Sequence, residues 1–373
     1  MTLINNIKNS VKKNYRSKIE KISFPVLTNL RNPKKKFKNI KGKIKLKYDR
    51  INDFVFNDAF EEKKIRYCKN YNNEQSLSSV FQTHLNDVFK IIKSNFKKKE
   101  KILEIGCGKG SFFKILEKNY KNIRGFDVSY EGNNKKIIKR YVTKKDQINE
   151  KLIILRHTLE HIPNPYNFLN FIKKISTNDP YILMEVPDLE WIKLKQTFFD
   201  ITYEHVNYFT MKTFENLFSK KLFFKKKVFN KQYLIVIAKL NNLNKNYKSN
   251  IKCKNISINK IFPNLAKQIM SYNNINQNIF IWGAATKGLM FLIYLKKINP
   301  LIFKKVKFAV DIDRKKQNKF LQIVDIKIIS PKKLLKVMKT GDTIIVANSN
   351  YLSEVQKYVQ KIKSKKINYK CID

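Results

Sequence analysis

A glycine-rich turn constrains the fold of this chain more than any other feature. Residues 102–110 read ILEIGCGKG, in which four residues of strand type precede Gly106, Gly108 and Gly110. Apolar residues at helical spacing follow over 111–116. Glycines permit a tight turn and let the backbone come close to a ligand. The pattern therefore predicts a strand–turn–helix unit of a parallel α/β sheet that receives an adenosyl cofactor.

An acidic residue supports this interpretation. Asp127 follows the next predicted strand, over residues 122–126, and a carboxylate at that place can accept both ribose hydroxyls. The GxGxG spacing differs from the GxGxxG of dinucleotide folds and from the P-loop pattern. The alternative is a packing turn with a solvated Asp127.

Strand-like and helix-like segments alternate over residues 71–240, as in a parallel sheet. An amphipathic helix is expected within 71–100, ahead of the first strand. The expected strands are 101–105, 122–126, 151–155 and 180–186, with later strands near 222–229 and 232–238.

The C-terminal part repeats the opening pattern on a smaller scale. Residues 279–282 have strand character, the small-residue turn Gly283–Gly288 follows, and 306–311 ends in an acid. We therefore expect four parts: a basic N-terminal region 1–70, an α/β domain 71–240, a polar linker 241–255, and a second Rossmann-like domain 256–373.

Composition excludes several classes of protein. No run of 18 uncharged apolar residues exists, so no membrane span is expected. The formal net charge is +49, but only 8 of the 78 basic residues are arginines. Proteins that recognise nucleic-acid bases favour arginine, whose guanidinium group makes bidentate hydrogen bonds to base edges. A nucleic-acid partner is therefore not expected. Four scattered cysteines without a CxxC pair fit a reducing cytoplasm and predict neither disulfides nor a metal site.

Three of the four histidines fall in two short polar stretches, 155–165 and 200–209. His157 and His161 lie just past a predicted strand end, which faces the ligand crevice in open α/β sheets. Their HxxEH spacing matches zinc peptidases, but Pro163 stops the sustained helix which that motif requires. Structural alternatives stay open: His161 packing on a short helix, and His205 as a solvated loop residue.

Several strings resemble known methyltransferases. EIGCGKG resembles motif I of class I S-adenosylmethionine (SAM) methyltransferases. LRHTLEHIPNP, MEVPD and FFDITYEHVNYFT resemble the SAM-dependent sugar C-methyltransferases, which methylate a carbon of nucleotide-linked keto-deoxysugars. The segment from Phe56 to Ser78 and the strings IWGAATKG, VDID and ANSNY extend the resemblance from about residue 50 to the end. Typical members have paired zinc-binding cysteines near the N-terminus, and this chain has none before Cys68.

The resemblance implies a fold, an activity and a set of site residues. It implies an α/β Rossmann-like methyltransferase domain plus a second, smaller Rossmann-like C-terminal domain, with SAM as cofactor. Because this chain lacks the paired cysteines of typical members, no metal is expected. The predicted cofactor site comprises Glu104, Gly106, Cys107, Gly108, Gly110, Asp127, Arg156 and His157. The predicted catalytic residues are His205, Glu204, Tyr203 and His161. The predicted substrate-binding residues are Tyr71, Gly283, Lys287 and Gly288.

The expected reaction is C-methylation of a nucleotide-linked keto-deoxysugar through an enolate. His205 would remove the acidified proton, Glu204 would support its ring, and a donor such as Tyr203, Tyr71 or His161 would stabilise the enolate oxygen. Gly283–Gly288 would cradle the diphosphate at a helix N-terminus, or it would only pack. The alternatives are O- or N-methylation of another small molecule or surface-polysaccharide precursor, a nucleic-acid methyltransferase, and a binder without turnover.

Overall fold

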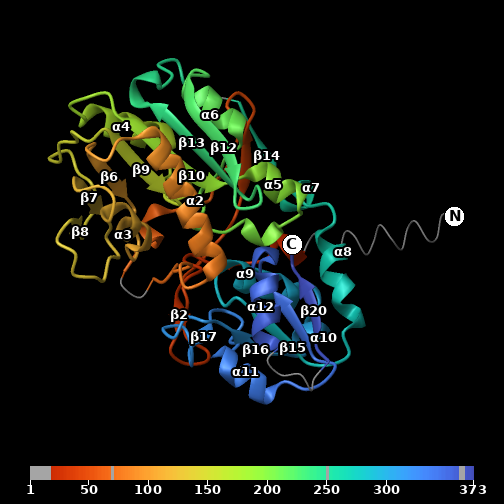
Figure 1. The fold of residues 1–373 in the computed structure, drawn as a ribbon. Helices are drawn as coiled ribbons and strands as arrows, with labels where there is room; N and C mark the ends of the chain where they lie inside the picture. The colour runs from red at the N-terminus through yellow and green to blue at the C-terminus, as the bar shows by residue number, and fades with distance from the viewer. Residues whose placement is uncertain (1–17, 69–70, 249–251, 361–365) are drawn as a thin grey trace. The chain divides into compact units, whose positions relative to one another are not determined.

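The computed structural model describes residues 18–68, 71–248, 252–360 and 366–373 (Figure 1). Contacts along the chain group into two compact units. The glycine-turn unit, named for its residues 102–110, comprises 46–192 and 205–255. The C-terminal unit comprises 256–373 together with 193–204 and the N-terminal residues up to 45.

A seven-stranded sheet forms the centre of the glycine-turn unit (Figure 1). Its strand order is β12-β13-β10-β9-β6-β7-β8, with β10, β9, β6, β7 and β8 paired in parallel and β13 and β12 added antiparallel. The bounds are β6 Ile102–Ile105, β7 Ile123–Phe126, β8 Ile137–Ile138, β9 Leu152–Arg156, β10 Tyr181–Pro187, β12 Leu222–Val228 and β13 Tyr233–Lys239.

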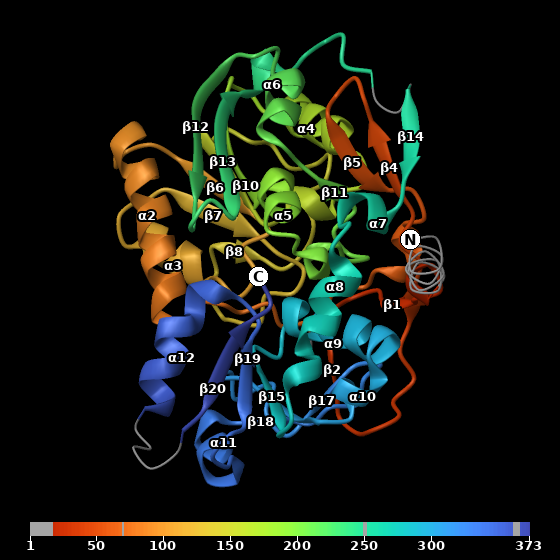
Figure 2. The ribbon, with the colours of Figure 1, turned by 90° about the vertical axis from the view of Figure 1, so that its right-hand side faces the viewer.

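Helices cover both faces of this sheet (Figure 2). The unit contains α2 Ser79–Asn95, α3 Ser111–Glu117, α4 Pro165–Lys174, most of α5 Leu189–Leu194, α6 Met211–Leu217 and the 3-10 turns η1 Glu62–Lys64, η2 Leu159–His161 and η4 Leu240–Asn242. Leu169 of α4 and Phe214 of α6 join one buried core with alternate strand residues such as Met184. On the other face, His84 of α2 contacts Glu185 of β10. Central strands buried on both faces explain the continuous apolar runs in the sequence.

A smaller sheet accompanies the large one in the order β11-β5-β4-β14. Its strands are β4 Leu46–Asp49, β5 Phe54–Asn57, β11 Asn207–Tyr208 and β14 Cys253–Ile256. Part of the expected N-terminal region and part of the expected linker therefore contribute strands to this sheet. The short strand β11 begins two residues after His205, so that its pairing with β5 fixes the course of the chain after this histidine.

The C-terminal unit contains a five-stranded parallel sheet in the order β18-β16-β15-β19-β20 (Figure 1). Its strands are β15 Ile279–Trp282, β16 Val306–Val310, β18 Ile328–Ile329, β19 Thr343–Val346 and β20 Asn368–Cys371. Its helices are α7 Ile258–Ile261, α8 Leu265–Met270, α9 Thr286–Ile298, α10 Pro300–Phe303, α11 Pro331–Val337 and α12 Leu352–Val359, with the 3-10 turns η3 Phe198–Asp200, η5 Ser271–Asn274 and η6 Ser349–Tyr351.

N-terminal residues also belong to the C-terminal unit. β1 Phe24–Pro25 pairs with β3 Lys41–Gly42, and β2 Arg31–Asn32 pairs with β17 Phe320–Leu321. The first 17 residues of the expected basic region lie outside the described residues.

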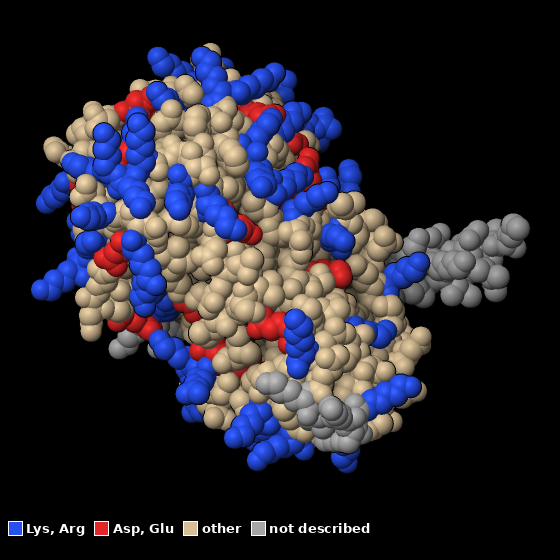
Figure 3. Space-filling model, in the orientation of Figure 1, with Lys and Arg blue, Asp and Glu red and all other residues tan. Residues whose placement is uncertain are grey.

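The predicted α/β fold is confirmed, with a mostly parallel seven-stranded sheet in one unit and a parallel five-stranded sheet in the other. All six strands expected in the first domain are present, and each begins and ends within one residue of its predicted bounds. The glycine turn lies between β6 and α3. None of the helices in the described ranges has the length and apolar character to cross a bilayer. Lysines and arginines lie over the visible face of both units, interspersed with acids, and do not gather in one stripe (Figure 3).

Candidate active site

The glycine turn after β6 adopts backbone conformations that require glycine. Gly106 and Gly108 have φ values of 79° and 57°, in the left-handed region. A Cβ atom on Gly106 would lie 2.2 Å from Oγ1 of Thr158, whereas a Cβ on Gly108 would meet nothing within 4 Å. Gly106 is therefore needed for packing, and Gly108 faces open space in which a ligand can approach the backbone. Gly110, at φ 80°, is the N-cap of α3.

Asp127 follows β7 and is held by the glycine turn itself. Its Oδ2 accepts a 2.7 Å hydrogen bond from the backbone N–H of Gly108. Its Oδ1 accepts hydrogen bonds from the backbone N–H of Ser129 at 2.6 Å and from its hydroxyl at 2.7 Å. These donors orient the carboxylate at the end of β7, where a ribose is bound in folds of this type.

A cavity of about 520 Å³ opens at the carboxyl ends of β6, β7 and β9. That volume suits a nucleoside-sized ligand. Seven of the eight predicted cofactor residues line the cavity, and Gly110 is not among the lining residues. The lining also includes His161, Tyr71 and Tyr67. Burial, together with Glu104 and Asp127, raises the pKa of the Cys107 thiol, so Cys107 serves as an apolar wall and not as a nucleophile.

Glu104 is the most deeply buried acid of the cavity wall. It is 2% exposed, and its Oε2 has no hydrogen-bond partner among the described residues. Burial raises the pKa of Glu104 to about 7, against the lowering effect of Arg156 and with a further increase from Asp127. A buried carboxylate oxygen without a partner is costly, so this atom is suited to a ligand that donates a hydrogen bond.

Arg156 and Glu185 form a buried ion pair between β9 and β10. Nε of Arg156 donates to Oε2 of Glu185 at 2.5 Å, and the guanidinium lies 4.4 Å from the ring centroid of Phe112. Glu185 also contacts Nε2 of His84 at 2.5 Å. Burial acts against the ionised form, but Arg156, His157 and His84 hold the pKa of Glu185 well below its ordinary value.

His157 has a strained backbone, with φ at 48°. This conformation brings its ring between two acids, with Nδ1 3.5 Å from Oε1 of Glu160 and Nε2 3.6 Å from Oε1 of Glu185. Burial opposes protonation, but the two carboxylates outweigh it and raise the pKa of His157 to about 9. His157 is therefore a cation at the base of the cavity near neutral pH.

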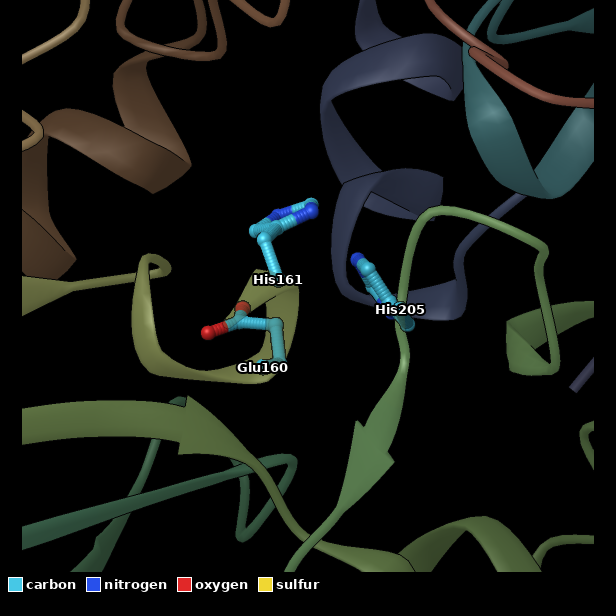
Figure 4. A group of neighbouring side chains, drawn as sticks. All are labelled: Glu160, His161 and His205. Atoms are coloured by element: carbon cyan, nitrogen blue, oxygen red, sulfur yellow. The ribbon is translucent and has the colours of Figure 1, made fainter. Parts of the chain in front are cut away.

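Glu160, His161 and His205 form a cluster beside the cavity (Figure 4). The rings of His161 and His205 meet edge to face, with centroids 4.9 Å apart. Glu160 is 1% exposed, and neither of its oxygens has a hydrogen-bond partner among the described residues. Burial opposes its ionisation, yet His157, His161 and His205 lower the pKa of Glu160. The sequence placed both histidines in the site, and the structure brings them together.

The donor atoms of this cluster lie within 4.8 Å of one another, and no other such group of three was found in the described ranges. Two imidazoles and a carboxylate are ligand types that zinc accepts. The helix that the HxxEH motif needs is absent, because η2 is a three-residue 3-10 turn. His157 instead contacts Glu160 and Glu185. Metal binding thus finds no support from the motif, and the expectation of no metal stays a prediction.

Glu204 and Tyr203, two predicted catalytic residues, lie in the C-terminal unit. The Glu204 carboxylate is 1% exposed and accepts hydrogen bonds from the backbone N–H of Thr28 at 2.8 Å and from its hydroxyl. Tyr203 is fully buried against Gly42, where any Cβ atom would overlap its ring. The Glu204 carboxylate is thus hydrogen-bonded to Thr28. Glu204 immediately precedes His205 in the chain.

The turn Gly283–Gly288 lies between β15 and α9, as expected. Within the same unit, the Thr286 hydroxyl contacts that of Thr28 at 2.7 Å, and Lys287 pairs with Asp200 at 3.1 Å. A Cβ atom on Gly288 would lie 2.2 Å from the carbonyl oxygen of Gly283. The N-terminus of α9 therefore contacts side chains of the unit's own loops, and any diphosphate must compete with Asp200 for Lys287.

Sequence reasoning missed three residues of the site. Thr158 packs on the glycine turn, Glu185 accepts a hydrogen bond from the buried Arg156, and Tyr67 contacts His161. Glu185 lies inside an apolar strand, so only its charge marked it. Tyr67 is one of 18 tyrosines and carried no signal of its own.

Comparison with known families places this geometry in a class. Residues 80–221 match a family model described as a methyltransferase domain. Residues 254–370 match a model described as a C-methyltransferase C-terminal domain. With the glycine turn, Asp127 and the cavity, these matches define the chain as a SAM-dependent methyltransferase. More particularly, it belongs to the methyltransferases in which the catalytic domain is followed by a C-methyltransferase C-terminal domain.

Solved structures similar to this chain include methyltransferases from several bacteria. The N-methyltransferase NodS from Bradyrhizobium japonicum WM9 is 11% identical, with 44% of this chain and 98% of that chain covered, at a TM-score of 0.32. A SAM-dependent methyltransferase from Aquifex aeolicus is 16% identical, with 43% and 96% covered, at a TM-score of 0.34. A search of curated proteins found no match.

Proposed function

We propose that this methyltransferase transfers the methyl group of SAM to a carbon next to the keto group of a nucleotide-linked deoxysugar. The observation that carries the proposal is the imidazole pair His161–His205 beside the cavity, in a chain with a C-methyltransferase C-terminal domain. Transfer to carbon needs a base, because a C–H bond does not attack an electrophile unaided. O- and N-methylation start from lone pairs and have less need of one.

The residues around the cavity suit the cofactor. The Asp127 side chain would accept hydrogen bonds from the ribose hydroxyls, and Oε2 of Glu104 would accept a hydrogen bond from the ligand. Gly108 leaves the backbone open to close approach. The bound cofactor supplies an electrophilic methyl group on a sulfonium. Arg156 and His157 would keep the charge balance of this buried wall through Glu185 and Glu160.

In the proposed reaction, His205 removes the proton from the carbon next to the substrate's carbonyl group. The C–H electron pair becomes the enolate, whose oxygen is stabilised by a hydrogen-bond donor. His161 and Tyr71 line the cavity and are the candidates, with Tyr203 a further one from the sequence. The enolate carbon forms a bond to the methyl carbon as the C–S bond breaks. The His205 imidazolium then returns its proton to solvent.

Glu204 has a structural role in this proposal. Its carboxylate accepts two hydrogen bonds from Thr28, and His205 is the next residue in the chain. We therefore propose that Glu204 fixes the peptide that carries the base. The expectation that Glu204 also supports the ring of His205 stays a prediction.

Gly283, Lys287 and Gly288 are proposed to bind the diphosphate of the substrate at the N-terminus of α9. Because Lys287 pairs with Asp200, Asp200→Asn should free the ammonium and tighten binding of a nucleoside diphosphate several-fold in calorimetry. Lys287→Met should weaken that binding. If both variants bind the nucleotide like the parent, the turn has only a packing role.

The proposed function also implies a location. The four cysteines, all within the described residues, form no disulfide, and we propose the cytoplasm as the compartment in which the enzyme works. Gel filtration of the purified protein will establish the oligomeric state.

One experiment tests the proposed function as a whole. The enzyme is incubated with SAM labelled with ¹³C at the methyl group and a panel of nucleotide-linked keto-deoxysugars. Heteronuclear NMR then gives the atom to which the label is attached. We expect a new methyl group bonded to carbon next to the carbonyl. A label on oxygen or nitrogen would support the O- or N-methyltransferase alternative and contradict the proposal.

A further inference from the structure

His84 is the one histidine of this chain to which the proposed function gives no role. It lies on α2, and its side chain is 3% exposed. Its Nε2 lies 2.5 Å from Oε1 of Glu185 on β10, whose side chain is fully buried. Both residues belong to the glycine-turn unit, and neither is among the residues that line the cavity. Any effect of this pair on a ligand must therefore pass through the residues of the cavity wall.

Glu185 connects His84 to the cavity wall through its second carboxylate oxygen. That oxygen, Oε2, accepts a 2.5 Å hydrogen bond from Nε of Arg156, which lines the cavity. The guanidinium lies 4.4 Å from the ring centroid of Phe112, another lining residue. A planar guanidinium that is hydrogen-bonded at one edge and lies over an aromatic ring is restrained in its orientation. The orientation of this part of the wall therefore depends on the position of the Glu185 carboxylate.

The two oxygens of Glu185 are held by two different elements. α2 supplies the partner of Oε1, and β9 supplies the donor to Oε2, so the carboxylate is restrained from rotating about its last side-chain bond. Burial opposes its ionisation, but Arg156, His157 and His84 hold the pKa of Glu185 well below its ordinary value. An ionised carboxylate can only accept hydrogen bonds. Nε2 of His84 therefore carries a proton and donates a hydrogen bond to Glu185.

Three aromatic rings pack against the imidazole of His84. The ring centroids of Phe229, Phe81 and Tyr233 lie 4.9, 5.4 and 5.7 Å from that of His84. Burial of a polar ring among aromatic side chains is costly unless its polar atoms are hydrogen-bonded. The hydrogen bond to Glu185 offsets this cost, and the three rings in turn restrict the orientation of the imidazole. A donor held in this way fixes the carboxylate in one position.

We infer that His84 is a positioning residue, which fixes Glu185 and through it the guanidinium of Arg156 in the wall of the cofactor cavity. The pair keeps this wall in its binding geometry before the cofactor arrives, as the residues behind a preorganised site do. The inference rests on the proposed function for the assignment of this cavity to SAM. The hydrogen bonds themselves do not depend on a ligand, and they can be measured on the unliganded protein.

The first measurement is NMR of the full-length parent protein labelled with ¹⁵N. The chain has four histidines, so four pairs of ring nitrogen signals are expected, and His84→Gln identifies the pair from His84. We expect a proton on Nε2 of His84 and a slowly exchanging Nε–H of Arg156, which Arg156→Lys identifies. An Nε2 of His84 without a proton would overturn the inference, because it could not donate to Glu185.

The second measurement compares the hydrogen exchange of the Arg156 Nε–H among variants. His84→Phe keeps a ring but removes the donor, and we expect exchange about tenfold or more faster than in the parent. His84→Gln supplies an amide donor and should return the exchange toward the parent rate. Val88→Ala is the matched control, because Val88 is buried on the same helix and is not a lining residue. An unchanged rate in His84→Phe, or an equal increase in Val88→Ala, would overturn the inference. If His84→Phe fails to fold, the parent spectrum still decides.

Calorimetry with the demethylated cofactor gives the functional readout. His84→Phe should weaken binding about 3–30-fold, because it removes a hydrogen bond to a charged group, and Arg156→Met should weaken it at least as much. Val88→Ala should bind like the parent. Affinity of His84→Phe equal to that of the parent, despite faster exchange at Arg156, would overturn the role of His84 in cofactor binding. Affinity of Arg156→Met equal to that of the parent would instead contradict the proposed cofactor site, and with it the inferred role, while the hydrogen bonds of His84 would stand as measured.

Discussion

The backbone N–H of Gly108 donates a 2.7 Å hydrogen bond to Oδ2 of Asp127, so that the glycine turn after β6 fixes the acid after β7. The two sequence features that first indicated a cofactor site are thus physically joined.

We predict that Asp127→Ala weakens binding of the demethylated cofactor about 10–100-fold. The variant removes a charged acceptor, and a hydrogen bond to a charged group contributes about 1.5–3 kcal/mol. Isothermal titration calorimetry measures the change. Asp87→Ala, which removes an exposed acid from α2, is the matched control and should bind like the parent. Affinity of the Asp127 variant within twofold of the parent would remove Asp127 from the site.

Cofactor binding should depend on pH through Glu104. Burial raises the pKa of Glu104 to about 7, so this carboxyl group is largely protonated at pH 5.5 and ionised at pH 8. A ligand that carries positive charge prefers the ionised form. We therefore expect affinity to rise by up to about tenfold per pH unit below pH 7 and to level off above it. The variant Glu104→Gln should bind weakly, with a flat profile; a slope equal to that of the parent would contradict the assignment.

His157 should contribute stability at low and neutral pH that is lost in base. Burial opposes its protonation, but Glu160 and Glu185 raise its folded pKa from 6.5 to about 9. The contribution is full below pH 6.5 and disappears as the pH rises through 9, with a total of about 3 kcal/mol. The stability difference between the parent and His157→Gln should shrink accordingly.

The two tryptophans allow the free energy of unfolding to be measured in one unit at a time. Trp191 lies in the glycine-turn unit and Trp282 in the C-terminal unit. In a Trp282→Phe background, Trp191 fluorescence during urea unfolding reports on the unit that contains His157. A stability difference that stays constant from pH 6.5 to 9.5 would show that the two carboxylates do not stabilise the histidine cation.

Thr28 should stabilise the C-terminal unit through its hydroxyl group. The hydroxyl donates to the buried carboxylate of Glu204 and contacts Thr286 at 2.7 Å. Thr28→Val keeps the shape but leaves that carboxylate with one donor fewer, at a cost of about 1–3 kcal/mol. Thr28→Ser keeps the donor and is the control. Equal urea midpoints for the two variants, followed by Trp282 in a Trp191→Phe background, would exclude the role.

The sequence was sufficient for the fold and for the wall of the cavity because local rules determine both. Apolar runs marked β6, β7, β9 and β10, and the glycines at 106 and 108 marked the turn that they form. Side-chain partners distant in sequence could not be predicted. Tyr67 and His161 are 94 positions apart, and Thr28 and Glu204 are 176 apart, without a spacing rule to connect them. The role of Glu185 could not be predicted, because an acid inside a strand indicates a site only once its buried partners, such as Arg156, are known.

Exchange of the substrate's own proton tests the role of His205 most directly. The enzyme is incubated in D₂O with a nucleotide-linked keto-deoxysugar and the demethylated cofactor, so that no methyl group is available. We predict that deuterium enters the carbon next to the carbonyl, and that His205→Ala slows this exchange by about 2–4 orders of magnitude while it binds the cofactor normally. Exchange at the parent rate in His205→Ala would contradict the assignment of His205 as the base.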